Sequence, residues 1–296
     1  MTADNPSKPN HLDPSELGTK EYWDSLYTTE LTNHTSNPSD RGTVWFDDSD
    51  AEAKLLEYLE DQTTTTTTSS SSSSSSQQQH PLLDRNTTSF LDLGCGNGSL
   101  LLALRDDGWA GRALGVDYSD KSVALARQVA QAHRRDEEEE EKVREELDDD
   151  EEGECRGDGS SSSSSRVRNE EVEFAAWDVL QGSYDAVLSG AQAQGWDVVL
   201  DKGTFDAISL SEEQGADGRR SCEGYKGRVV RLVRPGGLFL VTSCNWTEEE
   251  LERWFGEGSS EVEGGRFVRV GKVEYPSFSF GGVKGQTIST LCFQRV

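Results

Sequence analysis

The chain has 296 residues, a formal net charge of −26, and five scattered cysteines with no CxxC pair. This acidity disfavours nucleic acid as a partner, because phosphate binding needs a basic patch, and it favours a basic protein; acidity that only keeps the chain soluble is an equally good explanation. The cysteines predict neither a disulfide framework nor a metal site, and no apolar stretch reaches the length of a membrane span. We therefore expect no membrane contact, and we predict a monomer in the cytoplasm.

Three segments are too poor in apolar residues to fold, so we expect them to be disordered. Residues 1–14 form a polar tail, and residues 63–79 contain only Thr, Ser and Gln. Residues 136–168 are first acidic and then rich in serine, with 14 acidic residues against two basic ones between Asp136 and Glu154. The remainder of 15–296 predicts a single folded domain that carries two disordered insertions.

Two helices are predicted before the first insertion. Thr19 can cap a helix whose aromatic and apolar residues recur at helical spacing, from Tyr22 to Leu31. Ser49 with Glu52 has the spacing of a capping box and predicts the start of the second helix.

After residue 89, strand and helix patterns alternate. Near-continuous apolar strands are predicted at 90–93, 112–116, 172–176, 196–200 and 238–242, and helices follow most of them. Thr247 with Glu250 forms a second capping box. Residues 266–273 and 286–294 leave no room for a helix between them, so they predict a closing hairpin with an antiparallel strand. The fold class is α/β, with a doubly wound, mostly parallel, seven-stranded sheet.

A glycine turn follows the first of these strands. Gly94, Gly96 and Gly98 lack a Cβ, tolerate positive φ and lead into a helix start that presents free N–H groups. Such a turn binds adenosine cofactors in many enzymes, although by itself it also leaves open a structural turn or another nucleotide.

Three carboxylates end later strands. Asp117 lies 23 residues after Gly94, where a carboxylate accepts hydrogen bonds from ribose hydroxyls in several cofactor classes. Asp178 is a candidate acceptor for an adenine amino group, with Trp177 or Val179 beside the ring, but an Asp that caps the next turn fits as well. Asp201 ends the fourth strand, and Asn245 follows the fifth at the same edge of the sheet.

The motifs LDLGCGNG, VLDKGTFDAISL and RPGGLFLVTSCNWT, together with Asp117 and the Trp177–Asp178 pair, resemble seven-β-strand S-adenosylmethionine methyltransferases with a Rossmann-like fold. More narrowly, with LGTKEYWD, VWF and PSFSFGG, they resemble the lysine methyltransferases that modify translation elongation factor 1-alpha. The resemblance covers nearly the whole chain outside the tail and the two insertions.

The resemblance implies S-adenosyl-L-methionine as cofactor and elongation factor 1-alpha as the basic protein substrate. It implies that Asp117 binds the ribose, that Asp178 binds the adenine amino group and that Trp45 covers the cofactor. The implied cofactor-binding set is Trp45, Asp92, Gly94, Cys95, Gly96, Asn97, Gly98, Asp117, Tyr118, Asp178, Val179 and Asp201.

Asp201 is expected to orient the incoming lysine amine, with Asn245 as the second candidate. Trp45, Phe46 and Trp246 are candidates to line a channel for the lysine stem, although core packing explains Phe46 and Trp246 equally well.

Three alternatives stay open at this point. A methyltransferase of the same fold acting on a small molecule, on nucleic acid or on another protein is the nearest one. A nicotinamide-dependent dehydrogenase is disfavoured because Ser99 stands where the third glycine of GxGxxG would be. A scaffold without activity is disfavoured by the intact glycine turn and its carboxylates.

Overall fold

A seven-stranded sheet forms the centre of the molecule in the computed structural model, which describes residues 10–63, 83–151, 171–215, 218–256, 264–280 and 283–296. The strand order is β3-β2-β1-β4-β5-β9-β6. The strands are β1 Phe90–Leu93, β2 Ala113–Asp117, β3 Glu173–Ala176, β4 Trp196–Lys202, β5 Val233–Ser243, β6 Phe267–Val273 and β9 Ser289–Arg295. β1 to β5 run parallel, whereas β9 is antiparallel to both β5 and β6. The predicted doubly wound sheet with an antiparallel closing strand is confirmed.

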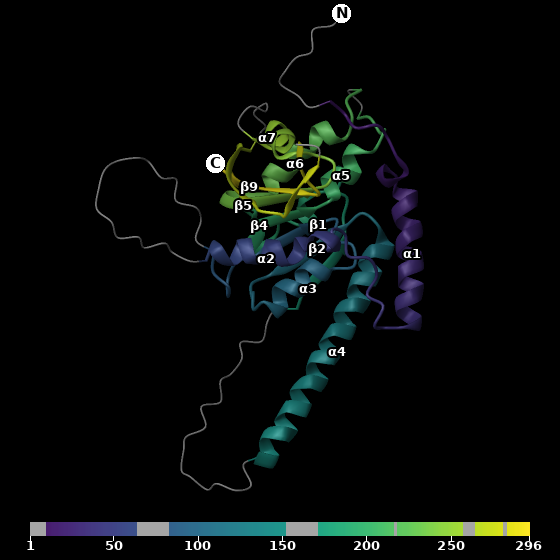
Figure 1. The fold of residues 1–296 in the computed structure, drawn as a ribbon, viewed down its shortest axis with the longest axis vertical. Helices are drawn as coiled ribbons and strands as arrows, with labels where there is room; N and C mark the ends of the chain where they lie inside the picture. The colour runs from purple at the N-terminus through teal and green to yellow at the C-terminus, as the bar shows by residue number, and fades with distance from the viewer. Residues whose placement is uncertain (1–9, 64–82, 152–170, 216–217, 257–263, 281–282) are drawn as a thin grey trace, which may run out of the picture.

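Helices cover both faces of this sheet (Figure 1). They are α1 Lys20–Ser36, α2 Ala51–Asp61, α3 Ser99–Asp106, α4 Asp120–Glu151, α5 Thr204–Ser209, α6 Cys222–Leu232 and α7 Glu248–Phe255, with short 3-10 turns at η1 Glu16–Gly18, η2 Asp47–Ser49, η4 Tyr184–Ala186 and η5 Gly190–Gln192. Because side chains alternate along a strand, Phe90 joins the core under α2, α3 and α4, while Leu91 joins the core under α5, α6 and α7.

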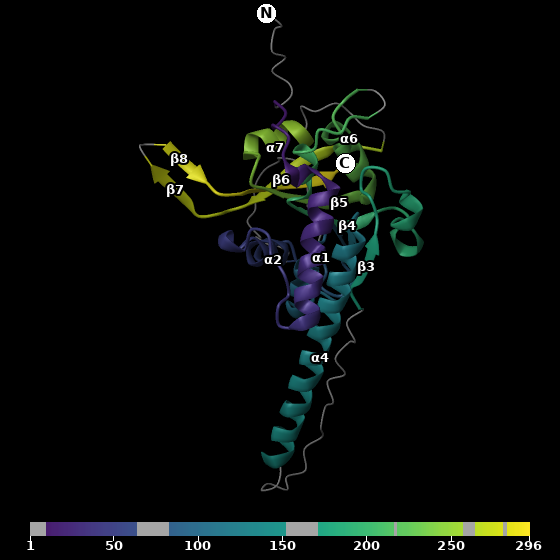
Figure 2. The same ribbon diagram turned by 90° about the vertical axis from the view of Figure 1, so that its right-hand side faces the viewer.

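α4 is the longest helix and runs well beyond the body of the molecule (Figures 1 and 2). Its first half lies against α1, where Ser119 Oγ donates to Asp24 at 2.6 Å just before α4 begins. The prediction of disorder from residue 136 is wrong as far as Glu151, because the helix continues to that residue. Glu, Lys and Arg are strong helix formers, and Glu138 precedes Lys142 by four residues, the favourable order for a helical ion pair. Residues 152–168 lie outside the described part of the chain, as do residues 64–79.

A separate two-stranded ribbon connects β6 to β9. It consists of β7 Ser277–Phe280 and β8 Val283–Gln286, which pair with each other and not with the main sheet. Figure 2 shows it projecting sideways from the body. The closing hairpin was predicted without this ribbon, since sequence spacing alone does not separate an added arm from a loop.

Two of the predicted helix caps are present. Thr19 accepts the backbone N–H of Tyr22 at the start of α1. At α7, Thr247 and Glu250 form the complete capping box.

The capping box predicted at Ser49 is wrong. α2 has Asp50 as its N-cap, with no side-chain cap hydrogen bond. Ser49 Oγ instead lies 2.9 Å from Thr287 Oγ1, and Glu52 accepts a hydrogen bond from Ser99 Oγ at 2.6 Å. Ser49 and Glu52 therefore contact residues distant in sequence and do not cap the N-terminus of α2.

The N-terminal tail is ordered from Asn10 onward in the described residues. Leu12 packs against the core under α5–α7, and its carbonyl accepts a 2.6 Å hydrogen bond from Arg220. His11 Nε2 lies 3.5 Å from Glu223. The prediction of disorder is wrong for this stretch, and residues 1–9 lie outside the description.

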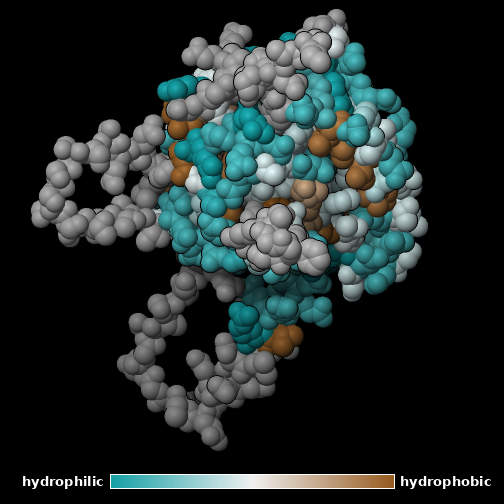
Figure 3. Space-filling model, turned by 45° about the horizontal axis from the view of Figure 1, so that its top comes forward, coloured by the Kyte–Doolittle hydropathy of each residue, from teal (hydrophilic) through white to brown (hydrophobic). Residues whose placement is uncertain are grey.

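The surface agrees with the composition, of which 28% is charged. The face drawn in Figure 3 is largely hydrophilic, with hydrophobic residues in small groups. Among the described helices, none combines the length and apolar character that a bilayer span requires.

Candidate active site

A cavity of about 340 Å³ lies at the carboxyl ends of the parallel strands. β2 and β3 lie on one side of β1, and β4 and β5 lie on the other, so the chain order reverses here. In doubly wound sheets, ligands bind outside the strand ends at such a point. The strand ends contribute Gly94, Val116, Asp117, Trp177, Asp178, Lys202, Gly203, Cys244 and Asn245, and the N-terminal segment contributes Leu17, Gly18, Lys20, Trp23, Tyr27, Trp45 and Phe46.

The structure brings eight of the predicted residues together around this cavity. They are Trp45, Phe46, Gly94, Asp117, Tyr118, Asp178, Val179 and Asn245. Seven other predicted residues do not line it: Asp92, Cys95, Gly96, Asn97, Gly98, Asp201 and Trp246.

The glycine turn has the backbone conformation that its sequence predicts. Gly94, Gly96 and Gly98 have φ of 66°, 56° and 80°. A Cβ added to Gly94 would overlap Thr204 Oγ1, which donates to Leu93 O at 2.6 Å, and one added to Gly98 would lie 2.6 Å from the Phe174 ring. Gly94 and Gly98 thus allow neighbouring side chains to pack closely on the turn, and Gly94 also lines the cavity.

Asp117 lies at the end of β2 with its carboxylate buried and facing the glycine turn. Oδ1 accepts the N–H of Ser119 at 2.9 Å, and Oδ2 accepts Ser122 Oγ at 2.8 Å and the N–H of Gly96 at 3.3 Å. Burial raises the pKa of Asp117, although these hydrogen bonds oppose the rise. Beside it, the ring of Tyr118 is 38% exposed and lies under Lys20 Nζ at 5.4 Å.

Asp178 has the turn-capping role that the sequence offered as one of two alternatives. Its Oδ1 accepts the N–H groups of Leu180 at 2.7 Å and Gln181 at 3.3 Å, so it caps the turn after β3. It also lines the cavity together with Val179. Oδ1 carries both of the hydrogen bonds described for this carboxylate.

Asp92 lies in β1 next to the cavity without lining it. Burial raises its pKa to about 8, partly opposed by the positive charge of Lys202. Its carboxyl has no hydrogen bond to the described residues, so the protonated form is favoured near neutral pH.

The segment Arg41–Phe46, which we call the strap, lines the cavity with two aromatic residues, Trp45 and Phe46. Lys202 Nζ donates to Trp45 O at 3.0 Å, and the Asn97 side-chain amide donates to Arg41 O at 2.9 Å and Thr43 O at 3.3 Å. Asn97 therefore supports the cavity by holding the strap.

Aromatic rings pack along the strap and the facing side of α1. Trp45 lies 5.4 Å from Trp23 in an edge-on arrangement, and Trp23 stacks on Tyr27 at 6.1 Å. Phe46 has a positive φ of 66°, a strained conformation for an aromatic residue, and its ring lies beside Gly203. The lining roles of Trp23 and Tyr27 were missed, since their helical spacing reads as ordinary core packing.

Asp201 is not placed to orient an amine in the cavity. It is 1% exposed, and its carboxylate accepts the N–H groups of Thr204 at 2.8 Å and Phe205 at 3.1 Å and the hydroxyl of Tyr225 at 2.6 Å. Burial raises its pKa to about 7 against these hydrogen bonds. We correct the expected role of Asp201: its side chain turns back to cap α5 and to fix α6 on β4.

Asp206 lines the cavity from α5 instead, and sequence reasoning did not select it. Its Oδ1 accepts Ser243 Oγ and its Oδ2 accepts the N–H of Cys244 at 2.8 Å. The available signal was the position of Asp206 in DKGTFDA, two residues after Thr204. Side chains two residues apart on a helix point in different directions. Thr204 points toward β1, where it binds Leu93 O, so Asp206 points elsewhere. Asn245 is exposed at the same rim, whereas Trp246 is buried against Phe205 and belongs to the core.

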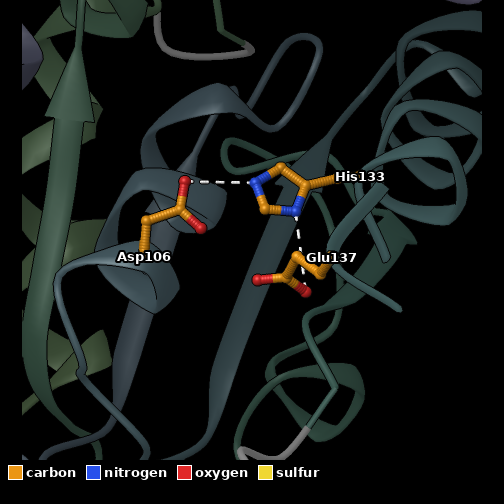
Figure 4. A group of neighbouring side chains, drawn as sticks. All are labelled: Asp106, His133 and Glu137. Atoms are coloured by element: carbon orange, nitrogen blue, oxygen red, sulfur yellow. Dashed lines mark hydrogen bonds and ion pairs between the residues drawn. The ribbon is translucent and has the colours of Figure 1, made fainter. Parts of the chain in front are cut away.

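One cluster outside the cavity has the residue types of a metal site. His133 of α4 lies between Asp106 Oδ2, 3.1 Å from Nε2, and Glu137 Oε2, 3.8 Å from Nδ1 (Figure 4). One ligand atom from each of the three residues lies within 4.8 Å of the other two, but Nε2 and Nδ1 of His133 each have a separate carboxylate partner. The arrangement fits a hydrogen-bonded link between α3 and α4.

Comparison with known proteins adds relatives of nearly full length. Residues 84–137 match the family described as a methyltransferase domain. The protein-lysine N-methyltransferase EFM4 of Saccharomyces cerevisiae is 33% identical over 96% of this chain and 96% of its own length. The EEF1A lysine methyltransferase 2 of Danio rerio is 28% identical over 98% of this chain and 93% of its own length. Among solved structures, a TehB-like SAM-dependent methyltransferase of Corynebacterium glutamicum aligns with 92% of this chain and 98% of its own, with a TM-score of 0.45 and 12% identity.

Proposed function

Because the chain belongs to the family of protein-lysine N-methyltransferases that includes EFM4, we propose that it transfers a methyl group from S-adenosylmethionine to a lysine of translation elongation factor 1A. The relative from Danio rerio is named for lysine methylation of EEF1A. The observation that carries the proposal is the cavity at the switch point, where a glycine turn, two strand-end carboxylates and an aromatic strap meet.

The residues on the β1–β3 side of the cavity suit the cofactor. Gly94 lines the cavity at the end of β1, beside the space for the methionine part, and Asp117 presents carboxylate oxygens of the kind that bind ribose hydroxyls. Asp178 has its Oδ2 available for the adenine amino group, with Val179 beside it. When bound, the cofactor supplies an electrophilic methyl group on a positively charged sulfur.

The other side of the cavity, toward β4 and β5, is left for the lysine. A lysine amine with the ordinary pKa of about 10.4 is neutral in about one molecule in 2,500 at pH 7, a gap of roughly 4.6 kcal/mol. Phe46 and Trp45 line this space, so an amine that enters it leaves water and loses part of its preference for the charged form.

The net charge of −26 supports a basic protein as the substrate, since a negative field attracts a positively charged partner. A cytoplasmic site of action is part of the proposal.

The test is methyl transfer to purified elongation factor 1A with isotopically labelled S-adenosylmethionine. We expect label in the factor, at one lysine found by mass spectrometry, and none in RNA incubated in the same way. Asp117→Ala is expected to lose cofactor binding in calorimetry and therefore all transfer. Tight binding of a nicotinamide cofactor, or transfer to RNA in place of the factor, would contradict the proposal.

A further inference from the structure

Four carboxylates line the cavity, and Asp206 differs from the other three. Asp117 and Asp178 lie at the ends of β2 and β3, and Glu213 is exposed. Asp206 lies on the opposite side of Gly94, next to the ends of β4 and β5, and is 5% exposed. Since the adenosine side of the site lies toward β2 and β3, Asp206 faces the half of the cavity left for the substrate.

The carboxylate of Asp206 is held in a fixed orientation. Ser243 donates to Oδ1, and the backbone of Cys244 donates to Oδ2. Ser243 Oγ in turn accepts the N–H groups of Asn245 at 3.1 Å and Trp246 at 2.9 Å. Each carboxylate oxygen accepts one of these two bonds, and the Cys244 thiol and the Asn245 N–H also lie near the carboxylate and lower its pKa. The two bonds to Ser243 and Cys244 N–H leave each oxygen a second lone pair for a donor in the cavity.

This buried carboxylate has no cationic partner among the described residues. The cavity's nearby ammonium group, Lys202 Nζ, is bound to Trp45 O and lies 3.4 Å from Glu52. An unpaired buried charge is costly, and a cation that enters the cavity offsets that cost. Burial correspondingly raises the pKa of Asp206, against the hydrogen bonds from Ser243 and Cys244.

We propose that Asp206 binds the ε-ammonium of the target lysine and accepts its proton; this rests on the proposed function. One carboxylate oxygen accepts an N–H of the ammonium and takes that proton, which leaves a neutral amine and a carboxylic acid. The nitrogen lone pair then forms the new N–C bond while the methyl–sulfur bond breaks and its electron pair goes to sulfur. The proton leaves Asp206 for solvent past Cys244 and Asn245, which are exposed at the rim.

The raised pKa of Asp206 suits this role, because it reduces the difference between the pKa of the carboxyl and the higher pKa of the lysine from which it takes the proton. The two aspartates of the DKGTFDA motif then have separate roles: Asp201 fixes α5 on β4, and α5 places Asp206 at the cavity.

The experiment compares Asp206→Asn with the wild type on elongation factor 1A between pH 7 and pH 10. At pH 7 we expect kcat/KM to fall about 100-fold, the usual contribution of a positioned proton acceptor. The deficit should shrink at least about tenfold toward pH 10, where the lysine loses its proton without help. Binding of S-adenosylhomocysteine, measured by calorimetry, should stay within about threefold of the wild type.

Two further variants separate this role from a structural one. Ser243→Ala keeps the carboxylate but removes a donor that orients it, so kcat/KM at pH 7 should fall about tenfold, less than in Asp206→Asn. Glu212→Gln makes the same charge change at an exposed position outside the cavity and should behave as the wild type. If Asp206→Asn does not fold, Asp206→Glu takes its place; it moves the carboxylate by one methylene and should lower kcat about tenfold with cofactor binding intact.

The assignment is overturned if Asp206→Asn keeps kcat/KM within threefold of the wild type, or if its deficit is independent of pH and matched by Ser243→Ala. Unchanged kcat in Asp206→Glu would overturn it as well. A wild-type protein that methylates no lysine of the factor would refute the proposed function itself, which is a different result from undiminished turnover in the variant.

Discussion

Gly18 places the N-terminal segment against α5, and its replacement by alanine tests how closely the cavity depends on that contact. A Cβ at Gly18 would lie well inside 3.0 Å of the backbone of Leu210 and Ser211, a distance that real Cβ atoms essentially never show. Backbone cannot rotate out of the way as a side chain does. The segment that contains Leu17 and Gly18, both in the cavity wall, must therefore move outward.

The cost of Gly18→Ala follows from two contributions. Overpacking in a well-filled site costs about 1–3 kcal/mol, and the displaced segment loses the hydrogen bond from Ser15 N–H to Leu210 O, now 3.1 Å, worth about 1 kcal/mol. A total of about 3 kcal/mol lowers Tm by about 6 °C in a chain of this size. The altered wall should weaken cofactor binding about tenfold, which is about 1.4 kcal/mol.

Thermal melts and calorimetric titration with S-adenosylhomocysteine measure both effects. Gly224→Ala is the matched control, because an added Cβ there has nothing within 4 Å and the residue lies in α6, where alanine stabilises a helix by about 0.5–1 kcal/mol. We expect Gly224→Ala to melt slightly above the wild type with unchanged cofactor affinity. The reasoning fails if Gly18→Ala melts at or above the wild-type temperature.

Three further predictions concern the cavity floor and the strap. Asn97→Ala removes the donors to Arg41 O and Thr43 O and the acceptor for Ser99 N–H, so the free energy of unfolding in a denaturant titration should fall by about 2 kcal/mol; a change below about 0.5 kcal/mol would contradict it. Lys202→Met keeps the apolar stem but removes the hydrogen bond to Trp45 O. The free energy of cofactor binding in calorimetry should therefore weaken by more than the free energy of unfolding, and an unchanged affinity would show that the strap does not need this bond. Asp92→Asn should stabilise the protein increasingly as pH rises. The pKa of Asp92 in the folded protein, about 8, lies above its unfolded value of about 3.9. The free energy of unfolding of the wild type therefore falls from about pH 4 to about pH 8, whereas a neutral amide at this position adds no such dependence. Above about pH 8 the difference between the two proteins is constant. Melts at pH 5 and pH 8.5 compare the two proteins, and a gap that does not widen would show that Asp92 is not held protonated.

Local patterns predicted the positive φ values of the glycine turn, the place of Asp117 at the end of β2 and the capping box at Thr247, because the partners of these residues lie within a few positions or on the adjacent strand. Ser49 carries the same cap signal as Thr247, yet its hydroxyl lies beside Thr287, more than 200 residues away in sequence. Such a choice between a local and a distant partner depends on packing that the sequence pattern does not contain.

The orientation of Asp201 illustrates the same limit at the site. The sequence places the carboxylate at the end of β4, where a ligand is expected, but not the direction in which the side chain turns. Tyr225 of α6 and the N–H groups at the start of α5 attract it away from the cavity. The acidic part of α4 is a different case, since low apolar content argued for disorder while helix propensity and ion-pair spacing argued for a helix.

Side chains outside the strap hold it in place by donating hydrogen bonds to its main-chain carbonyls. Asn97 binds the carbonyls of Arg41 and Thr43, and Lys202 binds that of Trp45. Every residue type has the same main-chain carbonyl, so substitutions at positions 41 and 43 keep these hydrogen bonds. Asn97 and Lys202 donate through their side chains, so substitutions there remove them. A library of substitutions should therefore tolerate changes at positions 41 and 43 and reject changes at positions 97 and 202.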